Sequence, residues 1–370
     1  MLPGRVFACA TALLLILLAT GCAGTASKAR AHRGDSAGAR LLQQYIQPRT
    51  HDLATRTGQL HAAVRDYCTD ASSAARRASV ESHLAATVEA WAAVEFLRFG
   101  PLVEQNRAEQ FFFWPDPRGV VQRQMRATLA GADPTLLQAE RLRTQSVAVQ
   151  GVPALEYALY ADEAARVIAA GGEDGRYRCA YAEAVTTNLA RLATEIESGW
   201  RGSAVLAAEF ARPVADNSVY RSEGEVATEV LKTLSTALHV ARDQKLHPAL
   251  GDSAAGARGA LLPLYRSGLT QRYLAAGIDT LAQFHAASAL GAALPPDATW
   301  MDTGVHDELR RVHEDLQAVT IPMDRAVADE EQRDLLIHAA LLLVNARAIV
   351  DEYLAPALGV NLGFNSLDGD

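Results

Sequence analysis

The chain has 370 residues, of which 49 % are apolar, 21 % are charged and only 6 % are aromatic. This composition excludes disorder for most of the chain and predicts a globular protein with an interior rich in alanine and leucine. The formal net charge of −8 argues against nucleic acid as a partner, because phosphate binding needs concentrated positive charge, and it is compatible with cations.

Residues 1–21 have the pattern of a bacterial lipoprotein signal peptide. Arg5 precedes an apolar run from Leu13 to Leu18, and small residues then lead to Cys22. The run is well short of the roughly 20 residues that a membrane-spanning helix needs. We therefore expect cleavage before Cys22 and lipidation of its thiol. The alternative is an ordinary secretory signal with a cysteine there by chance.

The residues that follow predict a tethered protein of the cell envelope. Residues 22–40 contain no large apolar side chain, which is typical of a flexible tether. The residue after the lipidated cysteine is Ala23 rather than the aspartate that favours retention in the inner membrane. In a cell with two membranes we expect the lipid anchor in the outer membrane, with the protein facing the periplasm.

Apolar residues recur at spacings of three and four along most of the remaining chain, as in Leu84, Val88 and Trp91. This spacing indicates the buried stripe of an amphipathic helix, and no hairpin signature is present. Clusters of proline and glycine separate the periodic segments. We predict an all-α fold, with helices over 41–67, 76–99, 118–131, 134–148, 152–170, 174–199, 222–245, 268–290, 303–319 and 326–355.

The chain beyond the tether is longer than a single hydrophobic core usually supports, so two domains are the expectation. The segment around 201–220 carries glycine, proline and polar residues and is the best boundary. We predict an N-terminal helical bundle over 41–205 and a C-terminal helical bundle over 218–370.

Two of the four cysteines are available for pairing in the mature protein. Cys9 leaves with the signal peptide and Cys22 carries the lipid, so Cys68 and Cys179 remain. An even pair in an oxidising compartment predicts one disulfide, although two separate buried thiols would give the same sequence. Neither cysteine has a second Cys or a His at ligand spacing, which argues against a zinc site.

The sequence has no His-Glu-x-x-His, Walker or dinucleotide-binding motif, and no catalytic residue is assigned. His239 and Asp243 are four residues apart on a predicted helix and could face one cation, although a hydrogen-bonded pair is the commoner outcome. His306 and His313 share a helix face, but Arg310 lies between them and would repel a metal.

Two segments stand out from the helical pattern. Residues 110–118 hold four aromatic side chains, two prolines and an Asp/Arg pair, which predicts a rigid corner. In residues 150–157, Pro153 suits the first turn of a helix, and Glu156 is favoured near the positive end of that helix. The second segment is either a well-made helix start or part of a binding site.

Six blocks, in the same order, make the chain resemble the imelysin-like protein family over roughly residues 41–370. The resemblance implies two helical-bundle halves, export to the periplasm or outer membrane, and frequent association with iron acquisition. The founding member of that family is described as an insulin-cleaving metallopeptidase. The blocks are WAAVEFLRFGP at 91–101, FWPDPR at 113–118, GVPALEY at 151–157, DQKLHPALG at 243–251, RSGL at 266–269 and LGFNSLDGD at 362–370.

The chain departs from this family at its proposed metal motif, Gly-x-His-x-x-Glu. The corresponding residues are Gly151, Pro153 and Glu156, so proline stands where the motif has histidine. Proline has no lone pair for a metal, and a single glutamate cannot hold Zn²⁺ or activate a water alone. The chain is therefore interpreted as a branch that keeps the scaffold without the histidine.

The resemblance places a binding site at the contact between the halves, with iron or another divalent metal as the implied ligand. Its expected lining is Glu156 together with the polar members of the other blocks: Glu95, Arg98, Asp116, Arg118, Asp243 and Arg266.

Three functions remain open. The preferred one is a non-catalytic, lipid-anchored binding protein that works with iron-uptake proteins of the envelope. The second is a divergent metallopeptidase with ligands drawn from His239, Asp243 or Glu156. The third is a structural envelope protein.

Overall fold

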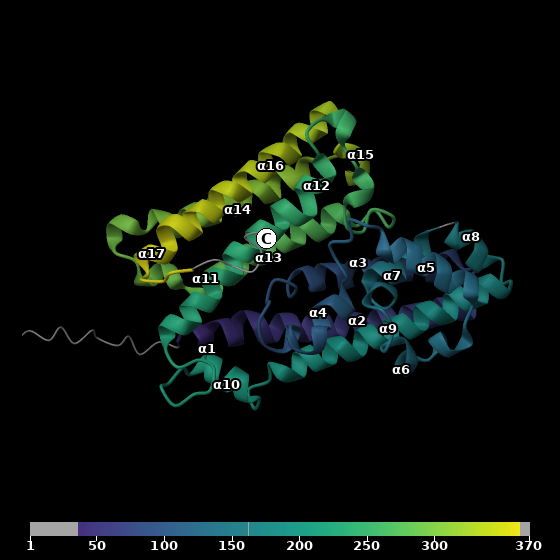
Figure 1. Cartoon of the computed structure of the whole chain (residues 1–370), viewed down its shortest axis with the longest axis horizontal. Coiled ribbons are helices and arrows are strands. Elements are labelled where there is room, and N and C mark those ends of the chain that lie inside the picture. Colours follow the sequence, from purple (N-terminus) through teal and green to yellow (C-terminus); the bar gives the residue numbers. More distant parts are fainter. Residues whose placement is uncertain (1–35, 162, 363–370) are drawn as a thin grey trace, which may run out of the picture. The chain divides into compact units, whose positions relative to one another are not determined.

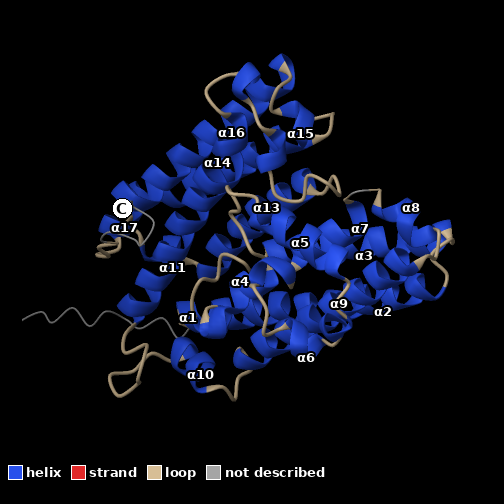
Figure 2. Ribbon diagram, turned by 45° about the vertical axis from the view of Figure 1, so that its right-hand side comes forward, coloured by secondary structure: helices blue, strands red, loops and turns tan. Residues whose placement is uncertain are grey.

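The computed structural model describes residues 36–161 and 163–362. The predicted signal peptide over 1–21 and the predicted lipidation at Cys22 lie outside the described residues. Within the described ranges the chain is made of helices and loops and contains no strand, which confirms the predicted all-α class (Figures 1 and 2). None of the helices described is both long and apolar enough to cross a bilayer.

The first part of the chain forms the helices from α1 to α10, and α1 begins inside the segment expected to be tether. Their bounds are α1 Ala37–Leu41, α2 Gln47–Thr69, α3 Ala74–Ala92, α4 Arg107–Phe111, α5 Val120–Gly131, α6 Ala139–Leu142, α7 Val152–Tyr160, α8 Ala164–Ala169, α9 Glu173–Gly199 and α10 Val205–Ala211. Short 3₁₀ turns lie between them: η2 Gly100–Leu102, η3 Glu104–Asn106, η4 Pro134–Leu137 and η5 Val147–Val149.

The second part of the chain forms the helices from α11 to α17. Their bounds are α11 Glu223–His239, α12 His247–Leu250, α13 Thr270–Ser288, α14 Trp300–Ala318, α15 Met323–Ala326, α16 Glu330–Ala348 and α17 Ala355–Ala357. The 3₁₀ turns here are η7 Ala254–Gly256, η8 Gly259–Leu261, η9 Leu290–Ala293 and η10 Pro296–Ala298. In the described part of the chain, three π-helical segments continue α1, α11 and α16: η1 Leu42–Ile46, η6 Val240–Leu246 and η11 Ile349–Leu354.

Side-chain caps begin several of the long helices. Ser73 accepts a hydrogen bond from the amide of Arg76 at the start of α3, and Asp329 accepts one from Gln332 at the start of α16. Each cap satisfies one of the amide groups that a first helical turn leaves without a partner. The sequence therefore sets these starts locally.

The long helices pack along their apolar stripes. Helix α2 lies against α3 and α9, α14 lies against α16, and α13 contacts both α3 and α14 (Figure 1). The buried apolar side chains form one cluster that draws on both predicted halves, from Leu84 and Trp91 to Leu343. The division into an N-terminal bundle over 41–205 and a C-terminal bundle over 218–370 stays a prediction.

A disulfide fastens α2 to α9. It joins Cys68 and Cys179, the pair expected from the sequence, with Cα atoms 5.6 Å apart. Two helices that already pack side by side are therefore also linked covalently.

Two predicted helices are interrupted. The segment 134–148 forms η4, α6 and η5 instead of one helix, because Gln138 has an extended backbone with φ −95° and ψ 118°. The segment 152–170 is divided into α7 and α8, because Ala161 is extended and Glu163 has a positive φ of 55°. Neither break has a proline or glycine at the point of interruption, so the sequence pattern did not signal it.

Candidate functional site

The start of α7 lies directly against the backbone of the aromatic segment that precedes it. A Cβ atom on Gly151 would come within 2.6 Å of the carbonyl oxygen of Phe111 and 2.8 Å of that of Gln110. Only glycine permits this approach without a backbone shift. Pro153 occupies the first turn of α7, where its missing amide proton costs no hydrogen bond.

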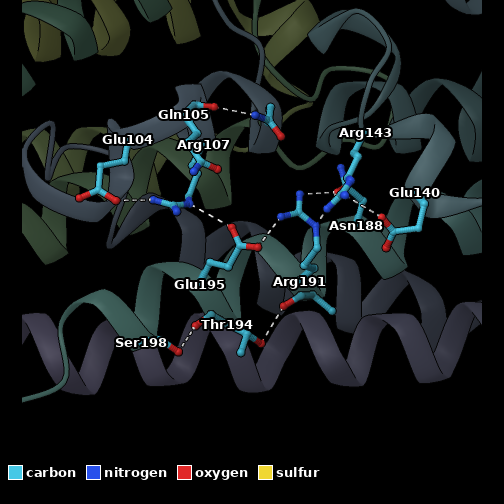
Figure 3. A network of polar contacts seen from close by, with 12 residues as sticks. Glu104, Gln105, Arg107, Glu140, Arg143, Asn188, Arg191, Thr194, Glu195 and Ser198 are labelled. Carbon is cyan, nitrogen blue, oxygen red and sulfur yellow. Dashed lines mark hydrogen bonds and ion pairs between the residues drawn. The ribbon is translucent and has the colours of Figure 1, made fainter. Parts of the chain in front are cut away.

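A polar network holds the residue that precedes this glycine. The side-chain amide of Asn188 on α9 donates to Oε1 of Gln150 at 3.2 Å. Arg191 donates to Oδ1 of Asn188 at 2.8 Å, and Glu195 accepts from both Arg191 and the largely buried Arg107 (Figure 3). The network fixes the loop before α7 to α9, so it positions the helix that carries Glu156.

Glu156 is a buried carboxylate with partners from a distant loop. Its side chain is 3 % exposed, and Oε1 accepts hydrogen bonds from the amide of Ser267 at 2.9 Å and from the Ser267 hydroxyl at 2.8 Å. Burial raises the pKa of this carboxyl above its usual range, and the two bonds from Ser267 offset part of that effect. The site therefore favours the protonated form of Glu156 more than water does.

Asp116 acts as a cap for α5. Its Oδ1 accepts from the amide of Val120 at 2.7 Å, and its Oδ2 accepts from the amide of Val121 at 2.8 Å. Gly119, with a positive φ of 61°, makes the tight turn that brings these amides onto the carboxylate. Both carboxylate oxygens are thus engaged, and the negative charge sits at the positive end of α5.

Arg266 presents its guanidinium group on aromatic faces. Its central carbon lies 4.4 Å from the ring centre of Tyr265 and 5.2 Å from that of Tyr157. One terminal nitrogen donates to Oε1 of Gln122 at 3.1 Å. These contacts hold a positive charge in a fixed orientation.

Asp116, Glu156 and Arg266 line one cavity, whose volume is about 190 Å³. The structure therefore brings three of the predicted polar candidates to one place, and Pro153 also lines it. Trp114 lines the same cavity, and its buried indole nitrogen has no hydrogen-bond partner among the described residues.

The remaining candidates lie elsewhere. Arg118 is exposed and does not line the cavity. Glu95 pairs with the ammonium group of Lys245 and accepts from the hydroxyl of Tyr273, and these residues line a separate, mostly apolar pocket of about 60 Å³ together with Arg98.

Asp243 lines a third pocket, of about 380 Å³, together with His239. Its Oδ2 lies 3.0 Å from Nδ1 of His239, and a terminal nitrogen of Arg347 lies 3.2 Å from the same histidine nitrogen. A guanidinium at this position disfavours a cation, and Glu156 does not line this pocket. The expected grouping of all candidates around one ligand is thus not what the structure shows, because the blocks lie on helices that pack at different places.

The residues at Glu156 do not fit a resident metal ion. Asp116 is occupied by two amides, Pro153 has no ligand atom, and the guanidinium of Arg266 adds positive charge. Across the described ranges, no group of three His, Cys, Asp or Glu side chains is arranged to hold a metal. Zinc and calcium sites need several such ligands on one point.

Sequence reasoning missed part of the site. Trp114 and Gln122 line the cavity, whereas Ser267 and Tyr157 do not line it but contact Glu156 and Arg266. Trp114, Tyr157 and Ser267 stand within the quoted blocks, next to residues that were singled out, and their position was the available signal. Gln122 carries no such signal, because it stands on a helix with no distinguishing pattern.

The raised pKa of Glu156 gives a test of its burial. The folded protein binds the proton more tightly than the unfolded chain, so stability is greatest below the unfolded pKa and falls as pH rises through the folded pKa. Glu156→Gln, which keeps an acceptor for Ser267, should remove this loss. We expect the variant to match or exceed the wild type in urea-unfolding midpoint at pH 8, with a smaller dependence on pH between 4 and 8. If the wild type became more stable from pH 4 to pH 8 and Glu156→Gln did not, the raised pKa assigned to Glu156 would be wrong.

The imelysin family model matches residues 42–350. The fold is similar to that of an imelysin-like protein from Psychrobacter arcticum, with 22 % identity, a TM-score of 0.71, and coverage of 90 % of this chain and 99 % of that one. It is also similar to a protein from Parabacteroides distasonis assigned as an iron-regulated protein A precursor, with 13 % identity, a TM-score of 0.68, and coverage of 86 % and 94 %. No curated protein matches the chain. With a family match over most of its length and the same helical architecture, the chain belongs to the imelysin family.

Proposed function

We propose that this protein is a non-catalytic binding protein of the cell envelope, anchored by lipid on Cys22 and associated with iron uptake. Its binding site is the cavity that holds Glu156 and Arg266. The observation that carries the proposal is the content of this cavity: it has oriented charged groups but lacks a ligand set for a catalytic metal.

The lack of a metal-ligand set argues against peptide hydrolysis at this place. A metallopeptidase activates its water on a metal with an open coordination position. Here Pro153 stands at the histidine position of the family motif, and Glu156 is hydrogen-bonded to Ser267. Such a site can hold a ligand, but it does not supply an activated nucleophile.

The iron association is drawn from a similar fold. One of the structures with this architecture is assigned as an iron-regulated protein A precursor. The name supports an exported protein whose production follows iron supply. The apolar run and small residues before Cys22 support the same export route.

The test compares cells and purified protein. We expect the amount of the chain to rise when iron is withheld, and we expect the protein in the outer-membrane fraction. The purified full chain should leave insulin and casein uncut in the presence of added zinc, manganese or iron.

Two results would count against the proposal. Production that ignores iron supply would remove the iron association. Cleavage of insulin that Glu156→Ala abolishes would establish a metallopeptidase instead, and Arg118→Ala, at an exposed site outside the cavity, is the matched control for that variant.

A further inference from the structure

We infer that the cavity at Glu156 and Arg266 binds a small organic carboxylate, either free or as part of the ligand shell of a metal chelate. This inference rests on the proposed function, which makes the cavity a binding site. The inference adds the class of ligand: the cavity binds an anion with oxygen acceptors and not a bare metal cation.

The first donor for such an anion is the guanidinium of Arg266. The rings of Tyr265 and Tyr157 support it at 4.4 and 5.2 Å, and Gln122 takes one terminal nitrogen at 3.1 Å. A guanidinium carries several N–H donors in a planar fork that matches the geometry of a carboxylate. Because its orientation is already fixed, less conformational entropy is lost when a ligand binds.

The second donor is the indole N–H of Trp114. This nitrogen is buried and has no acceptor among the described residues, although the side chain lines the cavity. A buried donor without a partner costs free energy, and such groups in folded proteins usually have a partner in ordered water or a ligand. Neighbouring protein atoms cover this nitrogen, so an acceptor on the ligand reaches it only when a side chain beside Trp114 shifts on binding.

The acidic groups of the cavity are already engaged. Asp116 gives both oxygens to the amides of Val120 and Val121, and Glu156 accepts two hydrogen bonds from Ser267. Asp116 therefore has both oxygens engaged, and at Glu156 the two bonds to Oε1 and the favoured neutral form oppose a cation. A bare iron ion would have to compete with these bonds beside the positive charge of Arg266.

The size of the cavity limits the ligand. Its volume of about 190 Å³ is comparable to the dry cavity of about 150 Å³ that holds a benzene molecule in an engineered protein. A di- or tricarboxylate of a few carbon atoms fits this space, whereas a folded partner or a peptide does not enter it.

Isothermal titration of the purified full chain with acetate, succinate, citrate and ferric citrate tests the inference. We expect saturable binding of at least one of these probes. Arg266→Met should weaken it about tenfold to a hundredfold, the range for losing hydrogen bonds to a charged group. Arg266→Lys, which keeps the charge but not the fork, should fall between the wild type and Arg266→Met.

Three further variants complete the pattern. Trp114→Phe, which keeps the ring but removes the N–H, should weaken binding several-fold. Glu156→Gln should bind citrate more tightly, because it removes a carboxyl that can become negative. Arg118→Met, from the exposed end of the same segment, is the matched control and should bind as the wild type does.

The outcomes separate the possible sources and failures. Equal affinity for citrate and ferric citrate indicates the free carboxylate, and tighter binding of ferric citrate indicates the chelate. The inference is overturned if none of the probes binds at millimolar concentration, or if a correctly folded Arg266→Met binds as well as the wild type. The inference is also overturned if ferrous iron alone binds and this binding is lost in Glu156→Gln but kept in Arg266→Met. That result would leave standing the proposed role as a binding protein associated with iron uptake.

Discussion

Breaking the disulfide between Cys68 and Cys179 should lower the free energy of unfolding by about 4 kcal/mol, one of the two largest effects expected in this protein. The bond joins residues separated by 111 positions, so it closes a long loop in the unfolded chain. In the chain-entropy account, a cross-link over a longer loop removes more conformational freedom from the unfolded state.

Urea unfolding of the oxidised and reduced protein measures this effect. The Cys68→Ser/Cys179→Ser double variant should unfold at the lower urea concentration of the reduced protein, and reductant should not move its midpoint further. This control isolates the bond from other effects of the reductant. An oxidised wild type that unfolds at the same midpoint as the double variant would show that the bond adds no stability.

Replacing Lys245 with methionine should destabilise the protein by about 3–5 kcal/mol, because it leaves a buried carboxylate without its cation. The side chains of Lys245 and Glu95 are only 9 % and 12 % exposed, and they form a direct ion pair. The ammonium group also lies 4.3 Å from the ring centre of Tyr273, whose hydroxyl donates to Glu95. Removal of Lys245 thus leaves one hydrogen bond to hold the charge of Glu95.

A double variant distinguishes the cost of the lone charge from the value of the pair. Glu95→Gln/Lys245→Met should recover much of the lost stability, because a neutral pair in an apolar pocket carries no desolvated charge. Arg98→Met is the matched control from the same segment. Its ion pair with Glu109 is exposed on both sides and should contribute less than about 1 kcal/mol. A Lys245→Met variant as stable as this control would refute the buried-pair interpretation.

The regular part of the fold was predictable because its signal is local. Leu84, Val88 and Trp91 recur at helical spacing, and all three are at most 1 % exposed on one face of α3. The buried face of a helix can be predicted from this spacing without knowing which helix packs against it. The interruptions at Gln138 and Glu163 escaped prediction, because neither residue is a type that usually breaks a helix.

The candidate site was predictable in its members but not in its grouping. Glu156, Asp116 and Arg266 were named through the family resemblance, and they do line one cavity. Glu95 and Asp243 were named on the same ground, yet each lines a different pocket. Family blocks identify residues worth attention, but a shared block does not say which side chains meet.

By itself, the sequence determined the all-α class, most of the long helices and the place of Pro153 in the first turn of a helix. These properties depend on residue type and local spacing. Only the tertiary structure decided that Ser267 donates to Glu156, that Asp116 caps a helix and that the indole nitrogen of Trp114 has no acceptor among the described residues. Each of these facts depends on how the backbone folds around the side chain, and for Glu156 and Ser267 on contact between segments far apart in the chain. Spacing along a sequence carries no record of such contacts, so the anion site proposed above could be inferred only from the tertiary structure.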